Sequence, residues 1–180
     1  IRRSYPVDDS FITKFIDLDR CFSVMRFPVK DGKELVLVNS HMSAYDEGGK
    51  IRVQQLELLN SVMAEEYEAG NYVIVGGDFN HAMGEAVAEG FATEQKFPAW
   101  VSVLTSEELA DGIRMVRAEN ELDVPTCRGA DIPYIKGVNY TTAVDGFLVS
   151  ANIRATAENI DADFAYSDHN PVKLTFELMD

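Results

Sequence analysis

Two apolar runs with a helical pattern between them constrain the fold most. Glu34–Met42 and Tyr72–Gly77 are short and nearly continuous in aliphatic residues, which is typical of strands buried on both faces. Between them, Lys50–Ala69 repeats its apolar residues at three- and four-residue spacing, which predicts a helix. Gly70 follows where a left-handed helix cap is expected. A strand, a helix and a strand in this order predict an α/β or α+β sandwich with helices on the sheet faces.

The remaining chain adds strands at both ends of this unit. Asp17–Val29 is rich in β-formers and leads through the turn Lys30–Lys33 into the next strand, so the two predict a hairpin. Trp100–Ala110 has a weak pattern that we interpret as helical. Three further strands are predicted at Ala143–Ser150, Ile153–Asp161 and Val172–Leu178. With no repeat or linker in the sequence, residues 1–180 are predicted to form one domain.

The charge balance limits the partners of the chain. Sixteen basic residues stand against thirty acidic ones, for a net charge of −14, whereas tight nucleic-acid binding rests on Lys and Arg neutralising phosphates. An acidic protein acting on phosphate esters needs a cation at its site, and a divalent metal supplies one. No apolar run is long enough for a membrane span. Cys21 and Cys127 form no metal-binding or disulfide pattern and are interpreted as packing residues.

Polar clusters sit where the apolar strands end or begin. Because functional groups of open α/β sheets gather at such positions, six residues are candidates for one site. They are His41, Asp78, Asn80, Asp145, Asp168 and His169.

Taken singly, each cluster has a structural explanation. Asp78 and Asn80 fit a turn stabilised by the aspartate side chain, and His41 fits a buried histidine with satisfied nitrogens. Asp145 fits a solvated residue on an exposed strand face, and we interpret His81 as a structural or surface residue. Taken together, the carboxylates and amide offer oxygen ligands for Mg²⁺ or Mn²⁺, and the imidazoles face phosphate oxygens. The sequence shows no serine nucleophile elbow and no glycine-rich phosphate loop, so we favour metal-assisted attack of water on phosphorus.

Five motifs in order make the sequence similar to the endonuclease/exonuclease/phosphatase superfamily. They are Ser40-His41, Arg52 with Gln55, Gly77-Asp78-Phe79-Asn80, Val144-Asp145-Gly146-Phe147 and Ser167-Asp168-His169-Asn170-Pro171-Val172. The resemblance implies an α+β sandwich of two packed, mostly antiparallel sheets flanked by helices. It also implies a metal-dependent hydrolase acting on phosphoric esters.

The resemblance assigns a role to each candidate. Asp78 would orient or deprotonate the attacking water, and Asn80 would hold the scissile phosphate or a metal. His169 would donate to a phosphoryl oxygen, with Asp145 fixing its tautomer. His41 would stabilise charge on the phosphate, and Asp168 would lie in or next to the metal shell with Asp78 and Asn80. Arg52 and Gln55 are expected to brace the helix against the sheet.

One family feature has no counterpart in this sequence. The superfamily carries an Asn and a metal-binding Glu upstream of the Ser40-His41 motif, and the surroundings of Asp8, Asp9, Asp17 and Asp19 do not match it. The chain is therefore interpreted as the carboxy-terminal portion of the domain. Such a portion is expected to bind metal weakly, to be inactive or weakly active, and to dimerise through an uncovered sheet face.

Two functional classes follow from the sequence. We favour a metal-dependent phosphoesterase, and a non-catalytic binding or scaffold module is the alternative. A small phosphodiester, a phospholipid head group or a phosphorylated metabolite is preferred as substrate over nucleic acid because the chain lacks a basic stripe. The sequence does not indicate a localisation.

Overall fold

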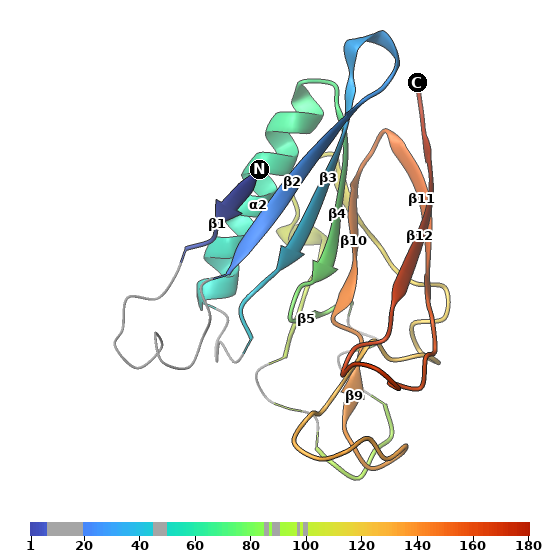
Figure 1. Ribbon diagram of the computed structural model, residues 1–180. Helices are drawn as coiled ribbons and strands as arrows, with labels where there is room; N and C mark the ends of the chain where they lie inside the picture. The colour runs from blue at the N-terminus through green and yellow to red at the C-terminus, as the bar shows by residue number, and fades with distance from the viewer. Residues whose placement is uncertain (7–19, 45–49, 85–86, 88–90, 97, 99–100) are drawn as a thin grey trace.

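A six-stranded sheet forms the middle layer of the molecule, with one helix on one face and a β-hairpin on the other (Figure 1). The computed structural model describes residues 1–6, 20–44, 50–84, 87, 91–96, 98 and 101–180. The strands of the sheet lie in the order β1 (Arg2–Ser4), β2 (Cys21–Pro28), β3 (Glu34–His41), β4 (Tyr72–Asp78), β10 (Asp145–Ser150) and β7 (Ile113–Val116). The α/β sandwich predicted from the sequence is thereby confirmed.

The helix α2 (Lys50–Glu68) connects the two parallel strands of the sheet. Strands β3 and β4 run parallel, and the other neighbours in the sheet are antiparallel. A parallel pair needs a crossover connection, and α2 provides it as predicted. Gly70 then adopts φ +85°, and its N–H donates to the Tyr67 carbonyl at 2.9 Å, which confirms the left-handed cap.

Alternating side chains of the central strands divide the core into two layers. Val36, Val75 and Leu148 belong to the buried cluster on the α2 face, where they pack with Leu56 and Leu59 of the helix. Because successive side chains of a strand point to opposite faces, the residues between them point the other way. The two-sided burial expected for these strands is therefore observed.

The hairpin β11 (Ile153–Asn159) and β12 (Val172–Leu178) covers the opposite face. Its strands pair antiparallel from Ile153 opposite Leu178 to Asn159 opposite Val172. Ile153 and Ala157 are buried against Ile74 and Val149 of the sheet. The second sheet of the sandwich is this hairpin.

The hairpin leaves the β2 side of that face open. Met25 and Phe27 pair with Leu37 and Leu35 of β3 and extend the same apolar face, yet they are 48% and 46% exposed. Phe176 of β12 is 42% exposed. We call the exposed residues Met25, Phe27 and Phe176 the apolar open face.

Short elements complete the described residues. The strand pairs are β5 (His81–Ala82) with β6 (Ser102–Val103) and β8 (Cys127–Arg128) with β9 (Thr141–Thr142), and the single-turn helices are η1 (Lys30–Gly32) and η2 (Ser106–Glu108). None of the described helices has the length and apolarity that crossing a membrane demands.

The helix predicted at Trp100–Ala110 is wrong for its described part. Trp100 itself lies outside the described residues, and the rest holds β6 and the single turn η2. Asn60 of α2 explains why the turn stops, since its side chain donates to the Glu108 carbonyl at 2.7 Å and accepts the Ala110 N–H at 3.1 Å. These tertiary bonds replace those that a continuing helix would make.

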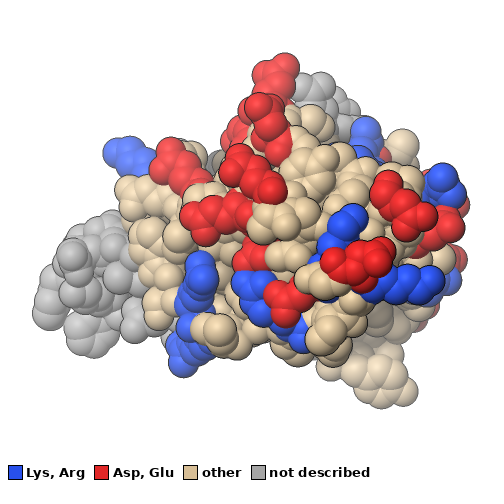
Figure 2. All heavy atoms as spheres, turned by 90° about the horizontal axis from the view of Figure 1, so that it is seen from above, with Lys and Arg blue, Asp and Glu red and all other residues tan. Residues whose placement is uncertain are grey.

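Charged side chains of both signs are spread over the surface. On the face seen in Figure 2, acidic groups alternate with smaller groups of Lys and Arg, and no continuous basic stripe crosses that face. This distribution agrees with the acidic composition.

Candidate active site

Three strands bring the first site residues into one row. In the ladder between β3 and β4, His41 lies opposite Asp78, and in the ladder between β4 and β10, Asp145 lies opposite the same Asp78. The parallel strands β3 and β4 both end at this edge of the sheet, and antiparallel β10 begins there. Sheet register therefore places an imidazole and two carboxylates side by side.

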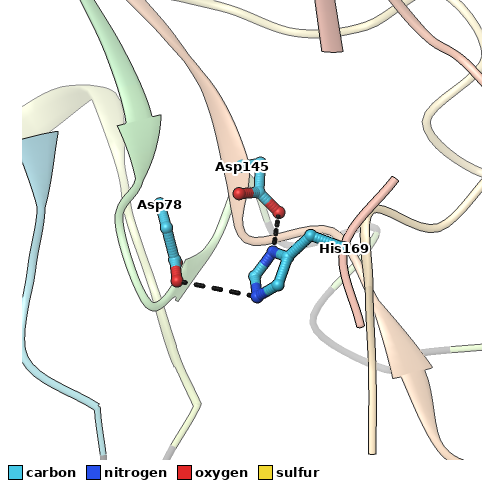
Figure 3. Close-up of side chains that lie close together, drawn as sticks. All are labelled: Asp78, Asp145 and His169. Atoms are coloured by element: carbon cyan, nitrogen blue, oxygen red, sulfur yellow. Dashed lines mark hydrogen bonds and ion pairs between the residues drawn. The ribbon is translucent and has the colours of Figure 1, made fainter. Parts of the chain in front are cut away.

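His169 reaches this row from the loop before β12. Its Nδ1 lies 2.8 Å from Asp145 Oδ2, and its Nε2 lies 3.9 Å from Asp78 Oδ2 (Figure 3). The backbone is held by a bridge to Cys127, and the His169 N–H donates to Ser167 Oγ at 3.1 Å. Donor atoms of Asp78, Asp145 and His169 all lie within 4.8 Å of one another.

The Asp145 carboxylate sets the protonation of His169. Burial alone would lower the pKa of His169, but the hydrogen bonds and charges of Asp145 and Cys127 raise that pKa to about 11. Burial raises the pKa of the Asp145 carboxyl, with the hydrogen bond to His169 opposing the rise. The pair thus holds a proton at neutral pH, with Nδ1–H donating to Asp145 and Nε2–H directed towards Asp78.

Asp78 and Asn80 form the tight turn that follows β4. The Asn80 N–H donates to Asp78 Oδ1 at 2.8 Å, and its amide Nδ2 donates to the Met42 carbonyl at 2.9 Å. Asn80 is buried with φ +49°, a left-handed conformation that asparagine tolerates. The structural explanation considered for this motif is correct, and the turn also leaves Asp78 Oδ2 next to His41 and His169.

Gln55 and Arg52 of α2 support the loops that carry the site. Gln55 accepts the Ser43 N–H at 2.8 Å and donates to Ser43 Oγ at 2.9 Å, which fixes the segment after β3. Arg52 donates to the Asn80 carbonyl at 3.4 Å. Both side chains are fully buried, in agreement with the bracing role expected for them.

His41 lies at the open rim of the site, and the interpretation as a buried histidine does not apply. Its side chain is 52% exposed, and its Nε2 lies 3.2 Å from Asp78 Oδ2. The same Nε2 lies 2.9 Å from Arg20 Nη1. Sequence reasoning missed Arg20, although an arginine directly before a strand that pairs with the His41 strand was a usable signal.

The candidate Asp168 and the histidine His81 stand apart from the cluster. The exposed Asp168 side chain contacts Ser167 Oγ at 3.4 Å, and it is not part of the group that Asp78 forms with Asp145 and His169. His81 is buried with Nδ1 2.8 Å from the Phe79 carbonyl, as befits a structural histidine. The upstream acids Asp8, Asp9, Asp17 and Asp19 lie outside the described residues.

The donor set fits a divalent cation that keeps several waters. Asp78 offers a carboxylate oxygen, while Asp145 is engaged by His169. Mg²⁺ and Mn²⁺ accept such a site, with one or two protein oxygens and the substrate supplying further ligands. The group that could hold such an ion consists of Asp78, Asp145 and His169.

Solved structures share this fold across nearly the whole chain. A truncated TDP2 from Caenorhabditis elegans superposes with a TM-score of 0.57 at 17% identity, covering 98% of this chain and 64% of that protein. An endonuclease/exonuclease/phosphatase protein from Beutenbergia cavernae gives 0.61 at 14% identity, covering 99% of this chain and 44% of its own. The fold is that of the endonuclease/exonuclease/phosphatase superfamily.

A third protein with the superfamily fold is ANGEL2, described as a 2′,3′-cyclic phosphatase in complex with adenosine-2′,3′-vanadate. It gives a TM-score of 0.59 at 15% identity, and the match covers 99% of this chain and 66% of ANGEL2. No protein-family model and no curated protein matches the sequence. The chain spans less than two thirds of the first TDP2 and superfamily structures that it resembles.

Proposed function

We propose that this chain carries the active site of a divalent-metal-dependent phosphoesterase. The observation that supports it best is the Asp145–His169 pair beside Asp78, at the edge of a sheet with the superfamily fold. A protonated imidazole next to a carboxylate provides both an acid and a base within a few ångströms. Hydrolysis of a phosphate ester needs both.

Each residue has a defined task in this proposal. Asp78 accepts a hydrogen bond from the attacking water and orients it, and His169 Nε2–H donates to a phosphoryl oxygen. Asp145 keeps His169 protonated and oriented, and His41 approaches the phosphate from the open side. When bound at Asp78 and Asn80, Mg²⁺ or Mn²⁺ supplies positive charge for the developing phosphate negative charge. Asp168 is proposed to act at the edge of that ion's shell.

The substrate class proposed is a phosphate ester with accessible oxygens. The acidic surface favours a small phosphodiester, a phospholipid head group or a phosphorylated metabolite over a nucleic-acid duplex. Two similar structures, a zebrafish (D. rerio) TDP2 complexed with a single-strand DNA product and ANGEL2 with an adenosine vanadate, add single-stranded ends and cyclic phosphates to the set to be tested.

The decisive experiment compares turnover of wild type with Asp78→Asn and His169→Ala. Substrates are bis-p-nitrophenyl phosphate, p-nitrophenyl phosphate, a single-stranded oligonucleotide and a lipid phosphodiester, each with Mg²⁺ or Mn²⁺. Asp111→Asn is the matched control, because this exposed aspartate precedes β7 at the end of β10 that lies opposite to Asp145. Metal-dependent turnover that both site variants lose by about 100-fold or more and the control keeps is the expected result.

Calorimetric titration with Mn²⁺ distinguishes the phosphoesterase from a non-catalytic binding or scaffold module. An unchanged rate in both site variants would contradict the proposed roles. Absence of turnover on every substrate, together with absence of metal binding, would favour the binding or scaffold module.

A further inference from the structure

Thr126 is fully buried between the segments that carry Asp145 and His169, and the proposed reaction gives it no task. Its carbonyl accepts the Asn170 N–H at 2.8 Å, and Cys127, which follows it, forms the backbone bridge to His169. The backbone of Thr126 is thus fixed to the loop before β12. From this position its side chain is hydrogen bonded to the beginning of β10, the strand of Asp145.

The Thr126 hydroxyl replaces a strand partner at the beginning of β10. The ladder between β10 and β7 reaches only to Phe147 opposite Val116, so Val144 and Asp145 lie beyond it. Thr126 Oγ1 accepts the Val144 N–H at 3.0 Å and the Asp145 N–H at 3.2 Å. A hydroxyl has two acceptor lone pairs and one proton, so both acceptor positions are used and the proton alone is left to donate.

The Asp145 carboxylate receives this remaining proton. Burial raises the pKa of the Asp145 carboxyl, and hydrogen bonds with the His169 and Thr126 side chains oppose the rise. Because a carboxylate only accepts hydrogen bonds, Thr126 is the donor of the second bond. One hydroxyl thus binds Asp145 at its N–H and at its carboxylate. A side chain held at both points has little freedom to turn away from His169 Nδ1, which lies 2.8 Å from Asp145 Oδ2.

We propose that Thr126 is a positioning residue of the active site, which holds the Asp145 carboxylate in the orientation that accepts the His169 Nδ1–H. The inference rests on the proposed function, because the orientation of His169 matters for turnover only if this ring donates to a phosphoryl oxygen. Buried hydrogen-bond partners behind a functional side chain fix its rotamer and the tautomer of a histidine. Thr126 acts through Asp145 and needs no contact with the substrate.

The test compares the full wild-type chain with Thr126→Val, Thr126→Ser and Thr142→Val. Valine keeps the branched shape and removes the hydroxyl, whereas serine keeps the hydroxyl and removes a methyl group. Thr142 on β9 provides the matched control, because it is as buried as Thr126 and its Oγ1 has no hydrogen-bond partner among the described residues. Urea unfolding establishes that each variant is folded.

The first measurement is NMR without substrate, in which the low-field proton of His169 Nδ1–H and the labelled ring nitrogens report the bond to Asp145. Thr126→Val should shift or broaden these signals, and Thr126→Ser and Thr142→Val should keep those of the wild type. In the wild type, the Thr126 hydroxyl proton should exchange slowly with water. Unchanged His169 signals in a folded Thr126→Val would overturn the inference. A Thr126 hydroxyl that exchanges as fast as that of the exposed Thr175 would also overturn it, even if the valine variant does not fold.

Turnover of bis-p-nitrophenyl phosphate with Mn²⁺ completes the test. Thr126→Val should lower kcat by about tenfold or more and change KM by less than about threefold, because only the orientation of the acid is lost. Thr126→Ser should restore most of kcat, and Thr142→Val should react as the wild type does. A serine variant as impaired as the valine variant would overturn the inference, since the hydroxyl would not be the cause. Altered His169 signals in Thr126→Val, in a chain without turnover on any substrate, would overturn the proposed function alone.

Discussion

At the scale of single residues, the environment of His169 determines how the site responds to pH. Its pKa is raised from 6.5 to about 11, so the protonated form is favoured by folding. The resulting stabilisation is fully present below pH 6.5 and is lost as the pH rises through the folded-state pKa near 11. Stability should therefore fall on the alkaline side.

Asp145→Asn tests directly whether the Asp145 carboxylate raises the pKa of His169. Without the carboxylate, burial dominates, and the pKa of His169 should fall by several units towards or below its ordinary value. NMR titration of the His169 ring measures that pKa, and urea unfolding between neutral and alkaline pH measures the stability. The variant should lose less stability than wild type over this range. An unchanged His169 titration would contradict the assignment to Asp145.

Gly77 shows the tightest steric constraint at the site. Its φ is +148°, and a Cβ added there would lie 1.8 Å from the Ser40 carbonyl oxygen. Gly77→Ala should therefore destabilise the fold by about 3 kcal/mol or more, since β3 and β4 must separate. Gly32→Ala, at φ +75° with open space around it, should cost about 1 kcal/mol. Urea unfolding of the two variants gives the comparison, and equal losses would contradict it.

At the scale of elements, helix α2 positions the loops after β3 and β4. Gln55→Leu would leave the buried Ser43 N–H without its acceptor, at a cost of about 1–3 kcal/mol. Gln54→Leu, at the neighbouring exposed position, should change stability by less than about 0.5 kcal/mol. Denaturant unfolding compares them. A similar loss in both would mean that Gln55 does not hold this loop.

The elements that sequence reasoning predicted well are those with strong local patterns. The strands at Tyr72–Gly77 and Val172–Leu178 and the helix from Lys50 were found at or within a residue of their observed bounds. The short strand Ile113–Val116 was missed because its pairing with β10 is a long-range contact with no local signature. The helix predicted near η2 does not form because Asn60, distant in sequence, bonds the backbone groups that a longer helix would pair internally.

The site residues also divide into those that local motifs predicted and those that depend on long-range contacts. Motif order predicted that Asp78, Asp145 and His169 share a site, and the structure brings them together. The contact of Arg20 with His41 depends on the register between β2 and β3, and the position of Arg20 directly before β2 was its local signal in the sequence. Whether Asp168 binds metal stays a prediction.

At the scale of the whole molecule, the apolar open face should control self-association. Exposed Met25, Phe27 and Phe176 favour a second copy because apolar surface is removed from water. Sedimentation velocity should show association of the wild type that increases with concentration and is absent in Phe27→Asp. Ile135→Asp, at an exposed apolar position between β8 and β9, should associate as the wild type does. A wild type that sediments as a monomer at every concentration would contradict this expectation.

The insertion of β10 between β4 and β7 has a consequence for synthesis on the ribosome. His41 and Asp78 emerge early, but Asp145 enters the sheet late, and His169 comes from the loop before the last strand. A nascent chain that has completed α2 and β4 already exposes Asp78 without its partners. The group formed by Asp78, Asp145 and His169 should therefore assemble only after residues 145–169 have left the exit tunnel.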